Sequence, residues 1–180
     1  MKRINVIGTS ASGKSTFSKA LAQQLHLTYI ELDDLFWLDD WQESSDQAFF
    51  KKLQQKIDLA PNGYVIDGNY TRTKHIKWKD IDTIIWLDLP FHVNVYRAVK
   101  RAIHRAVSKQ KIWANSNNQE TFKKLLSRES IIVWMMKTHH KNRKQYLKIM
   151  QSNEWSTIHW IRLRSVNDID RFLKQHHKPK

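Results

Sequence analysis

The sequence contains no cysteine, and it is poor in proline and glycine. The absence of cysteine excludes disulfides and thiolate-based zinc sites, and it fits a reducing compartment. With 3 prolines and 4 glycines among 180 residues, long flexible linkers are not expected. No stretch approaches the roughly 20 apolar residues of a membrane span, and the apolar run at 4–7 is too short for a signal peptide. We therefore expect one domain, residues 1–180, in a soluble cytoplasmic protein.

Acidic residues are scarce in the second half of the chain. Residues 1–90 carry 11 Lys and Arg against 12 Asp and Glu, whereas residues 91–180 carry 20 against 5. The whole formal net charge of +14 therefore comes from the second half. Such a surface attracts anions, and both phosphorylated small molecules and nucleic acid qualify. The alternative is a basic, solvated face without a ligand.

Short apolar runs alternate with helical patterns along the chain. Strands are expected at 4–7, 27–32, 64–66, 83–87 and 157–163. Helices are expected at 14–25, 45–59, 92–107, 119–151 and 168–173. This alternation predicts right-handed βαβ units, and thus a three-layer α/β fold around a five-stranded parallel sheet. The helical block at about 92–151 interrupts the alternation, and we interpret it as a basic helical lid or insertion.

The segment Gly8–Ser15 fits the phosphate-loop pattern G-x-x-x-x-G-K-[ST], and it lies between a predicted strand and a predicted helix. Its glycines allow the backbone N–H groups to curl toward phosphate oxygens, and the following helix adds its positive dipole end. Lys14 can reach the β and γ phosphates, and the Ser15 hydroxyl can ligate Mg²⁺. We expect ATP with Mg²⁺ to bind here, at Gly8, Thr9, Ser10, Ala11, Ser12, Gly13, Lys14, Ser15 and Thr16.

Aspartates follow three of the predicted strands, at the edge of the sheet where ligands of α/β proteins bind. A kinase needs carboxylates there to orient Mg²⁺ and to accept the proton of the attacking hydroxyl. We expect Asp33 to face that hydroxyl and Asp67 to lie on the magnesium side. The alternatives are that Asp33 or Asp34 caps the next helix, and that Asp67 serves a turn. For Asp88, close before a proline, a structural role is favoured.

Arginines are spaced by four in the basic helix, at Arg97, Arg101 and Arg105, so they share one face. Such an array repels itself unless an anion lies against it, and forked guanidinium groups suit a transferring phosphoryl group. The alternative is a solvated face. Arg72, soon after the third strand, is a further candidate anion contact.

Two tryptophans, Trp37 and Trp41, follow the Asp33–Asp34 pair. They either wall a substrate pocket or pack a loop. Trp86 in a predicted strand and Trp134 in a predicted helix are expected in the core.

On these residues the chain resembles the adenylate kinase-like P-loop kinases over nearly its whole length. Within them it is similar to the bacterial proteins labelled "DNA topology modulation" (FlaR-related). The resemblance rests on the phosphate loop, on Leu-Asp-Asp-Leu-Phe-Trp at 32–37, on Ile-Asp-Gly-Asn-Tyr at 66–70, and on 84–90 followed by two arginines. It implies a P-loop NTPase fold with a helical lid, in which Arg97 and Arg101 are lid arginines. Arg72 stands one residue later than the corresponding arginine of adenylate kinases.

The exit of the second strand lacks the arginine with which adenylate kinases grip AMP, and carries Asp33–Asp34 instead. The resemblance therefore implies a kinase that transfers the γ-phosphoryl group of ATP to a nucleoside or another small alcohol. Its expected catalytic residues are Lys14, Asp33, Arg97 and Arg101, with weaker substrate contacts from Asp34, Trp37 and Arg72. The alternatives are a nucleotide-dependent protein that binds nucleic acid through its basic half, and a simple NTPase.

Overall fold

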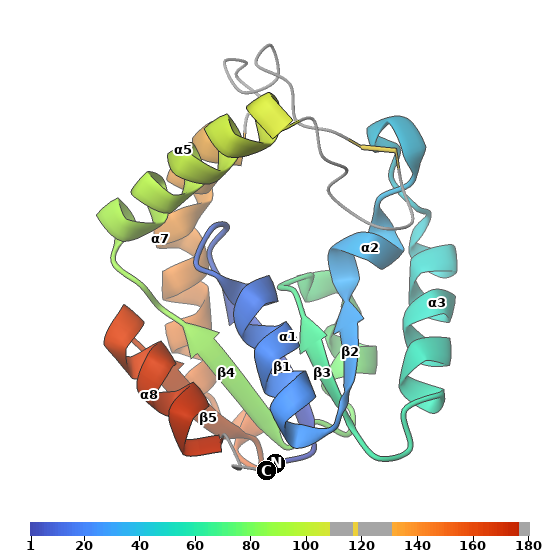
Figure 1. Ribbon diagram of the computed structural model, residues 1–180. Coiled ribbons are helices and arrows are strands. Elements are labelled where there is room, and N and C mark those ends of the chain that lie inside the picture. Colours follow the sequence, from blue (N-terminus) through green and yellow to red (C-terminus); the bar gives the residue numbers. More distant parts are fainter. Residues whose placement is uncertain (109–116, 119–130, 177–180) are drawn as a thin grey trace.

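A computed structural model describes residues 1–108, 117–118 and 131–176 of the chain. Five strands form one sheet in the order β2-β3-β1-β4-β5, and every neighbouring pair is parallel. The strands are β1 (Arg3–Gly8), β2 (Thr28–Glu31), β3 (Tyr64–Asp67), β4 (Thr83–Leu87) and β5 (His159–Leu163). The predicted five-stranded parallel sheet is thus confirmed. Because the strands run the same way, all their carboxyl ends meet at one edge, the upper edge in Figure 1.

Helices fill the connections between the strands. They are α1 (Lys14–Leu25), α2 (Leu32–Phe36), α3 (Asp46–Asp58), α4 (Lys74–Lys77), α5 (Phe91–Ser108), α7 (Ile131–Met150) and α8 (Val166–His176). Short 3₁₀ helices are η1 (Asp39–Trp41), η2 (Thr71–Thr73) and η3 (Asn153–Trp155). Sequence patterns did not predict α2 and α4, because helices of 5 and 4 residues are too short to show an apolar period. Of the helix predicted at 119–151 and of the predicted lid at 92–151, residues 109–116 and 119–130 lie outside the described residues, and so does the side chain of Trp134.

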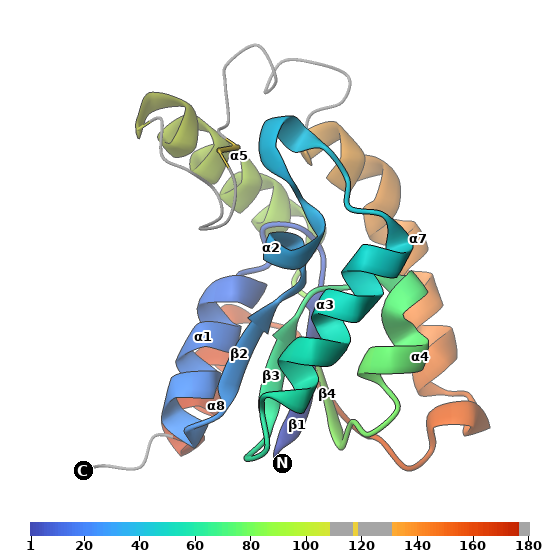
Figure 2. The same cartoon turned by 90° about the vertical axis from the view of Figure 1, so that its right-hand side faces the viewer.

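The central strands β1, β3 and β4 are covered on both faces of the sheet, so they are largely apolar runs rather than alternating patterns. On one face, Ile4 and Val6 of β1 join a cluster with Phe17 of α1 and Phe172 of α8. Figure 2 shows α1 and α8 together on that side. Each buried side chain of this size contributes roughly 2 kcal/mol to folding. This cluster fixes the start of α1 at the carboxyl edge of the sheet, directly after the loop that follows β1.

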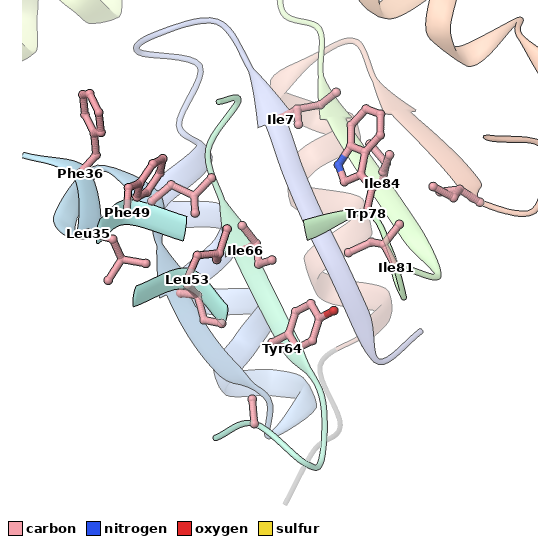
Figure 3. Packing of buried hydrophobic residues seen from close by; sticks show 14 of the residues in the cluster. Ile7, Leu35, Phe36, Phe49, Leu53, Tyr64, Ile66, Trp78, Ile81 and Ile84 are labelled. Atoms are coloured by element: carbon pink, nitrogen blue, oxygen red, sulfur yellow. The ribbon is translucent and has the colours of Figure 1, made fainter. Parts of the chain in front are cut away.

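The opposite face packs against α3, α4 and α7. Its cluster includes Ile7, Ile66, Phe49 and Trp78, drawn in Figure 3. Trp86 is 2% exposed in this cluster, which confirms its predicted place in the core.

A polar residue, Asn5, is fully buried under this cluster, and all its polar atoms are satisfied. Its Oδ1 accepts from the indole Nε1 of Trp78 at 2.8 Å, and its Nδ2 donates to the carbonyl oxygens of Ile66 (3.0 Å) and Gly68 (3.2 Å). A buried amide with both ends paired costs little and specifies one geometry. It therefore holds the end of β3 and the residues after it against β1.

At the amino end of β1, the Asp82 carboxylate binds the backbone where the strand begins. Its Oδ2 accepts from the backbone N–H groups of Lys2 (2.7 Å) and Arg3 (2.9 Å). Partial burial raises the pKa of Asp82, but the hydrogen bonds from the Thr83 hydroxyl and from these two N–H groups together lower it.

The carboxyl edge of the sheet is flanked on two sides. Figure 1 shows α5 and α7 on one side of the loop between β1 and α1, and α2 on the other. Within the described ranges, no helix combines the length and the apolar character needed to cross a bilayer.

Candidate active site

The loop between β1 and α1 has the backbone that its sequence pattern demands. Gly13 adopts φ 92°, in the left-handed region, and is the N-cap of α1 without any side-chain cap. A Cβ on Gly8 would lie 2.7 Å from the carbonyl oxygen of Leu87, so only glycine fits beside β4. The first N–H groups of α1 therefore face the loop without a capping side chain, as an anion site at a helix N-terminus requires.

The Lys14 side chain stands at the centre of the charged groups. Its Nζ donates to the carbonyl oxygen of Thr9 at 3.0 Å. Burial lowers the pKa of Lys14 and Arg101 lowers it further, whereas the nearby carboxylates of Asp67 and Asp33 raise it. The structure thus brings together four predicted site residues that are far apart in the sequence.

Asp67 ends β3 and is 4% exposed. Its Oδ2 accepts from the Tyr29 hydroxyl at 3.1 Å, and its buried Oδ1 has no hydrogen-bond partner among the described residues. The backbone also turns directly after it, since Gly68 adopts φ 140°. Asp67 therefore occupies the turn position, and it also presents a carboxylate oxygen beside the loop.

The oxygen atoms of Asp67 and of Ser15, half-buried at the start of α1, fit Mg²⁺. In the part of the chain that the structure describes, no group of three or more His, Cys, Asp or Glu could hold a metal by itself. Mg²⁺ keeps several waters and needs only one or two protein ligands beside the phosphates.

Asp33 lies in the first turn of α2 and is bound by a neighbouring phenol. Its Oδ1 accepts from the Tyr70 hydroxyl at 2.6 Å, and the Trp37 side chain in turn hydrogen-bonds to Tyr70. Burial raises the pKa of Asp33, while the Tyr70 hydrogen bond and Lys14 oppose the rise. The N-cap of α2 is Glu31, so the alternative that Asp33 or Asp34 is the cap is wrong.

Asp34 and Trp37 line a hollow of about 300 Å³ between α2 and α3, with Lys52, Gln55 and Lys56. Trp41 packs edge-to-face on Trp37, with ring centroids 5.8 Å apart.

The buried Asn118 side chain holds the loop that carries Trp41. Asn118 accepts from the N–H of Trp41 at 2.7 Å and donates to the carbonyl oxygen of Leu38 at 2.8 Å. Trp41 is therefore part of a packed loop, and Trp37 combines packing with the hydrogen bond to Tyr70.

Helix α5 lies directly against the phosphate loop. Ala98, which is fully buried, packs against Ala11. On the same side, Arg97 donates to the carbonyl oxygen of Ser12 at 3.1 Å, and Arg101 donates to the Ser10 hydroxyl at 3.3 Å. The alternative of a solvated face is therefore wrong for these two arginines, whereas the Arg105 side chain lies outside the described residues.

Two further predicted residues have acidic or basic partners elsewhere. Asp88 is 8% exposed and accepts from Arg162 (2.9 Å to Nε) and Arg143 (3.2 Å to Nε), which supports a structural role. Arg72 pairs with Asp46 of α3 at 2.8 Å and lies over the Phe36 ring, 4.8 Å from its centroid. These two contacts place Arg72 on the α2–α3 side of the site.

Sequence patterns missed three residues of the site. Asn69 exchanges two hydrogen bonds with Gly8, and Tyr70 holds Asp33. Their position directly after the third strand was the available signal. His139 of α7 lies 3.1 Å from the Thr9 hydroxyl through Nδ1, and burial lowers its pKa. It is separated from Thr9 by 130 residues, and no local pattern indicated the contact.

Comparison with known proteins finds kinases in sequence and in structure. No family model matches the chain. A shikimate kinase from Sulfurihydrogenibium sp. is 29% identical over 126 residues, which are 62% of this chain and 75% of that protein. A shikimate kinase from Persephonella marina is 26% identical over 103 residues, 50% of this chain and 63% of that protein. The uncharacterized protein YqaC of Bacillus subtilis is 25% identical over 104 residues, 58% of each chain, so the match spans little more than half of YqaC.

Solved structures show the same fold at low sequence identity. Shikimate kinase from Acinetobacter baumannii, in complex with shikimate, matches with TM-score 0.59 and 11% identity, covering 97% of this chain and 90% of that one. A gluconokinase from Sinorhizobium meliloti matches with TM-score 0.54 and 12% identity, covering 98% and 89%. A sugar kinase from Janibacter sp. matches with TM-score 0.52 and 16% identity, covering 97% and 93%. The chain therefore has the α/β P-loop fold of these kinases.

Proposed function

We propose that this chain is an ATP-dependent kinase that transfers the γ-phosphoryl group of ATP to a hydroxyl of a small molecule. The observation that carries the proposal is the meeting of Lys14 with Asp33, Asp67 and Arg101 beside an uncapped helix N-terminus. A phosphate loop alone serves many activities. Phosphoryl transfer to an alcohol requires, in addition, a carboxylate near the loop lysine, and the half-buried Asp33 lies near Lys14 in this way.

Each residue has a defined task in this reaction. The loop amides and Lys14 bind the β and γ phosphates. Ser15 and Asp67 would hold Mg²⁺, which would neutralise charge on the phosphate oxygens. Asp33 accepts the proton of the acceptor hydroxyl while the oxygen of that hydroxyl bonds to the γ-phosphorus. The bond from the γ-phosphorus to the bridging oxygen breaks, and ADP is the leaving group.

Arg97 and Arg101 stabilise the charge that spreads over the transferring group, since both already lie against the loop. Both lie on α5, the first helix of the proposed basic lid at 92–151. Relatives described as shikimate kinase, gluconokinase and sugar kinase support a small-molecule acceptor.

The aspartate pair Asp33–Asp34 at the exit of β2 favours an acceptor without negative charge near the reacting hydroxyl. Asp34, Trp37 and Arg72 are the proposed contacts to the rest of this acceptor. Nucleic-acid binding receives no support from the comparisons, whose characterised members are described as kinases.

The test measures ADP formation with Mg-ATP and a panel of nucleosides, sugars, polyols and shikimate. Acceptor-dependent turnover that falls by about 1,000-fold or more in Lys14→Ala, but not in the exposed control Lys51→Ala, supports the proposal. Steady ADP formation that no acceptor accelerates would identify a simple NTPase instead. Full turnover by Lys14→Ala would contradict any role of the loop.

A further inference from the structure

The segment after β3 makes a contact that the proposed mechanism does not use. The Asn69 carboxamide donates through Nδ2 to the carbonyl oxygen of Gly8 at 2.8 Å, and its Oδ1 accepts from the Gly8 N–H at 3.0 Å. One side chain thus pairs both backbone groups of one residue. A carboxamide is suited to this because it carries a donor and an acceptor side by side.

Gly8 is the residue at which the chain leaves β1 and begins the phosphate loop. On the β4 side it touches Leu87 so closely that no Cβ fits. On the β3 side Asn69 holds both its backbone groups. The direction in which the loop departs from the sheet is therefore set between Leu87 and Asn69, before any nucleotide contact is made.

The backbone of Asn69 is itself held by a buried lysine. Lys77 of α4 is fully buried, and its Nζ donates to the carbonyl oxygens of Asn69 (2.6 Å) and Gly68 (3.2 Å). Among the described residues no carboxylate forms an ion pair with Lys77. Burial lowers the pKa of Lys77 to about 7, so charged and uncharged forms are both populated near neutral pH, and either form has enough N–H groups for the two carbonyls. Burying the Lys77 amine costs solvation free energy, and its two hydrogen bonds to the segment after β3 offset that cost.

We propose that Asn69 is a positioning residue for the phosphate loop, held in place by Lys77, and that it presets the loop for the polyphosphate. The same segment carries Tyr70, which bonds to Asp33, so the loop and the acceptor carboxylate are set relative to one another. The proposal rests on the proposed function in one respect, namely that the loop binds Mg-ATP.

The test is Asn69→Ala, measured by calorimetric titration with Mg-ATP at a temperature where the variant is folded. The dissociation constant should rise about ten-fold or more, because the loop loses two hydrogen bonds that preset it. The matched control is Asp82→Ala. It also removes a side chain that bonds two backbone groups, those of Lys2 and Arg3, but at the opposite end of β1. Its affinity for Mg-ATP should stay within about two-fold of the unmodified protein.

A second variant covers the case in which Asn69→Ala does not fold. Asn69→Asp keeps the size of the side chain and the acceptor for the Gly8 N–H, but it sets an oxygen against the Gly8 carbonyl and adds negative charge. It should weaken Mg-ATP binding at least as much as the alanine variant. Unchanged affinity in a folded Asn69 variant overturns the proposal, and so does an equal loss in Asp82→Ala. Failure of the unmodified protein to bind Mg-ATP overturns the proposed function instead.

Discussion

The phosphate loop and the acceptor side of this site are built in different ways. The loop is one contiguous stretch, Gly8–Thr16, whose shape follows from two glycines and the start of α1. The acceptor side is assembled from side chains that follow different strands, since Asp33 follows β2 while Asp67 and Tyr70 come at and after β3. The comparison teaches that phosphate binding is encoded locally here, whereas the placement of the proton acceptor depends on strand order.

The largest expected effect on the acceptor side is that of Asp33→Asn. The amide keeps an oxygen for the Tyr70 hydroxyl but is a far weaker base, so kcat with the acceptor should fall by about 100-fold or more. Mg-ATP affinity should change by less than about three-fold, because the loop is built separately. Steady-state kinetics and titration measure both quantities.

The control for Asp33→Asn is Asp58→Asn, at the exposed end of α3. If Asp33→Asn weakened Mg-ATP binding as strongly as it lowered kcat, the phosphate loop and the acceptor side would not act independently of one another.

An intermediate effect is expected for Lys77→Met. The Lys77 side chain holds the segment that contacts both the phosphate loop and Asp33. Methionine fills the space but leaves the carbonyls of Gly68 and Asn69 without their donor, which costs roughly 1–3 kcal/mol of unfolding free energy. Denaturant unfolding at neutral pH measures this loss. The variant should also weaken Mg-ATP binding, by less than Asn69→Ala does.

The stability of Lys77→Met should also differ from that of the unmodified protein in its pH dependence. Burial, and secondarily Lys74, lower the pKa of Lys77 from 10.5 in the unfolded chain to about 7. Between these values the unfolded state binds the extra proton, so Lys77 makes the native protein more stable as pH rises from 7 to 9. The variant lacks this gain, so its unfolding free energy should fall relative to that of the unmodified protein across that window. Parallel pH curves would show that Lys77 does not titrate there.

The smallest expected effect is that of Tyr70→Phe. The phenol holds Asp33 and lowers its pKa, so its loss should raise that pKa and shift the acidic limb of the kcat/KM profile to higher pH. At neutral pH the activity should fall by a factor of roughly two to ten, since one hydrogen bond is removed. A pH–rate profile with an unmoved acidic limb would mean that Asp33 is not the group that titrates.

Much of this arrangement could be predicted from local patterns. The bounds of α1 follow from the glycine before Lys14 and the apolar spacing of Phe17 and Leu21, and they match the prediction. Lys14 and Asp67 lie near one another, as strand-end and loop positions led us to expect, and the roles expected for them in phosphate and magnesium binding stay predictions. Asp33 was recognised as a strand-end carboxylate, but the short helix that carries it was not predicted.

The residues that no pattern revealed act across the sheet. Asn69 meets Gly8 from 61 residues away, and its side chain resembles any other turn asparagine in the sequence. Lys77 reads as a surface lysine in a basic stretch, and only the packing of α4 under the end of β3 makes it buried. The position of Arg72 in the sequence suggested an anion contact, whereas in the structure its guanidinium pairs with Asp46 of α3.

Local sequence was enough to predict the phosphate loop, the α/β class and the aspartates at strand ends, because turns, periodicity and strand boundaries depend on neighbouring residues. Three contacts needed the folded chain: the phenol on Asp33, the arginines against the loop, and the asparagine on Gly8. The physical reason is the strand order, since β3 and β4 flank β1 and bring their following segments to the same edge. Distances across that edge are set by hydrogen bonds between strands, which leave no periodic trace in the chain.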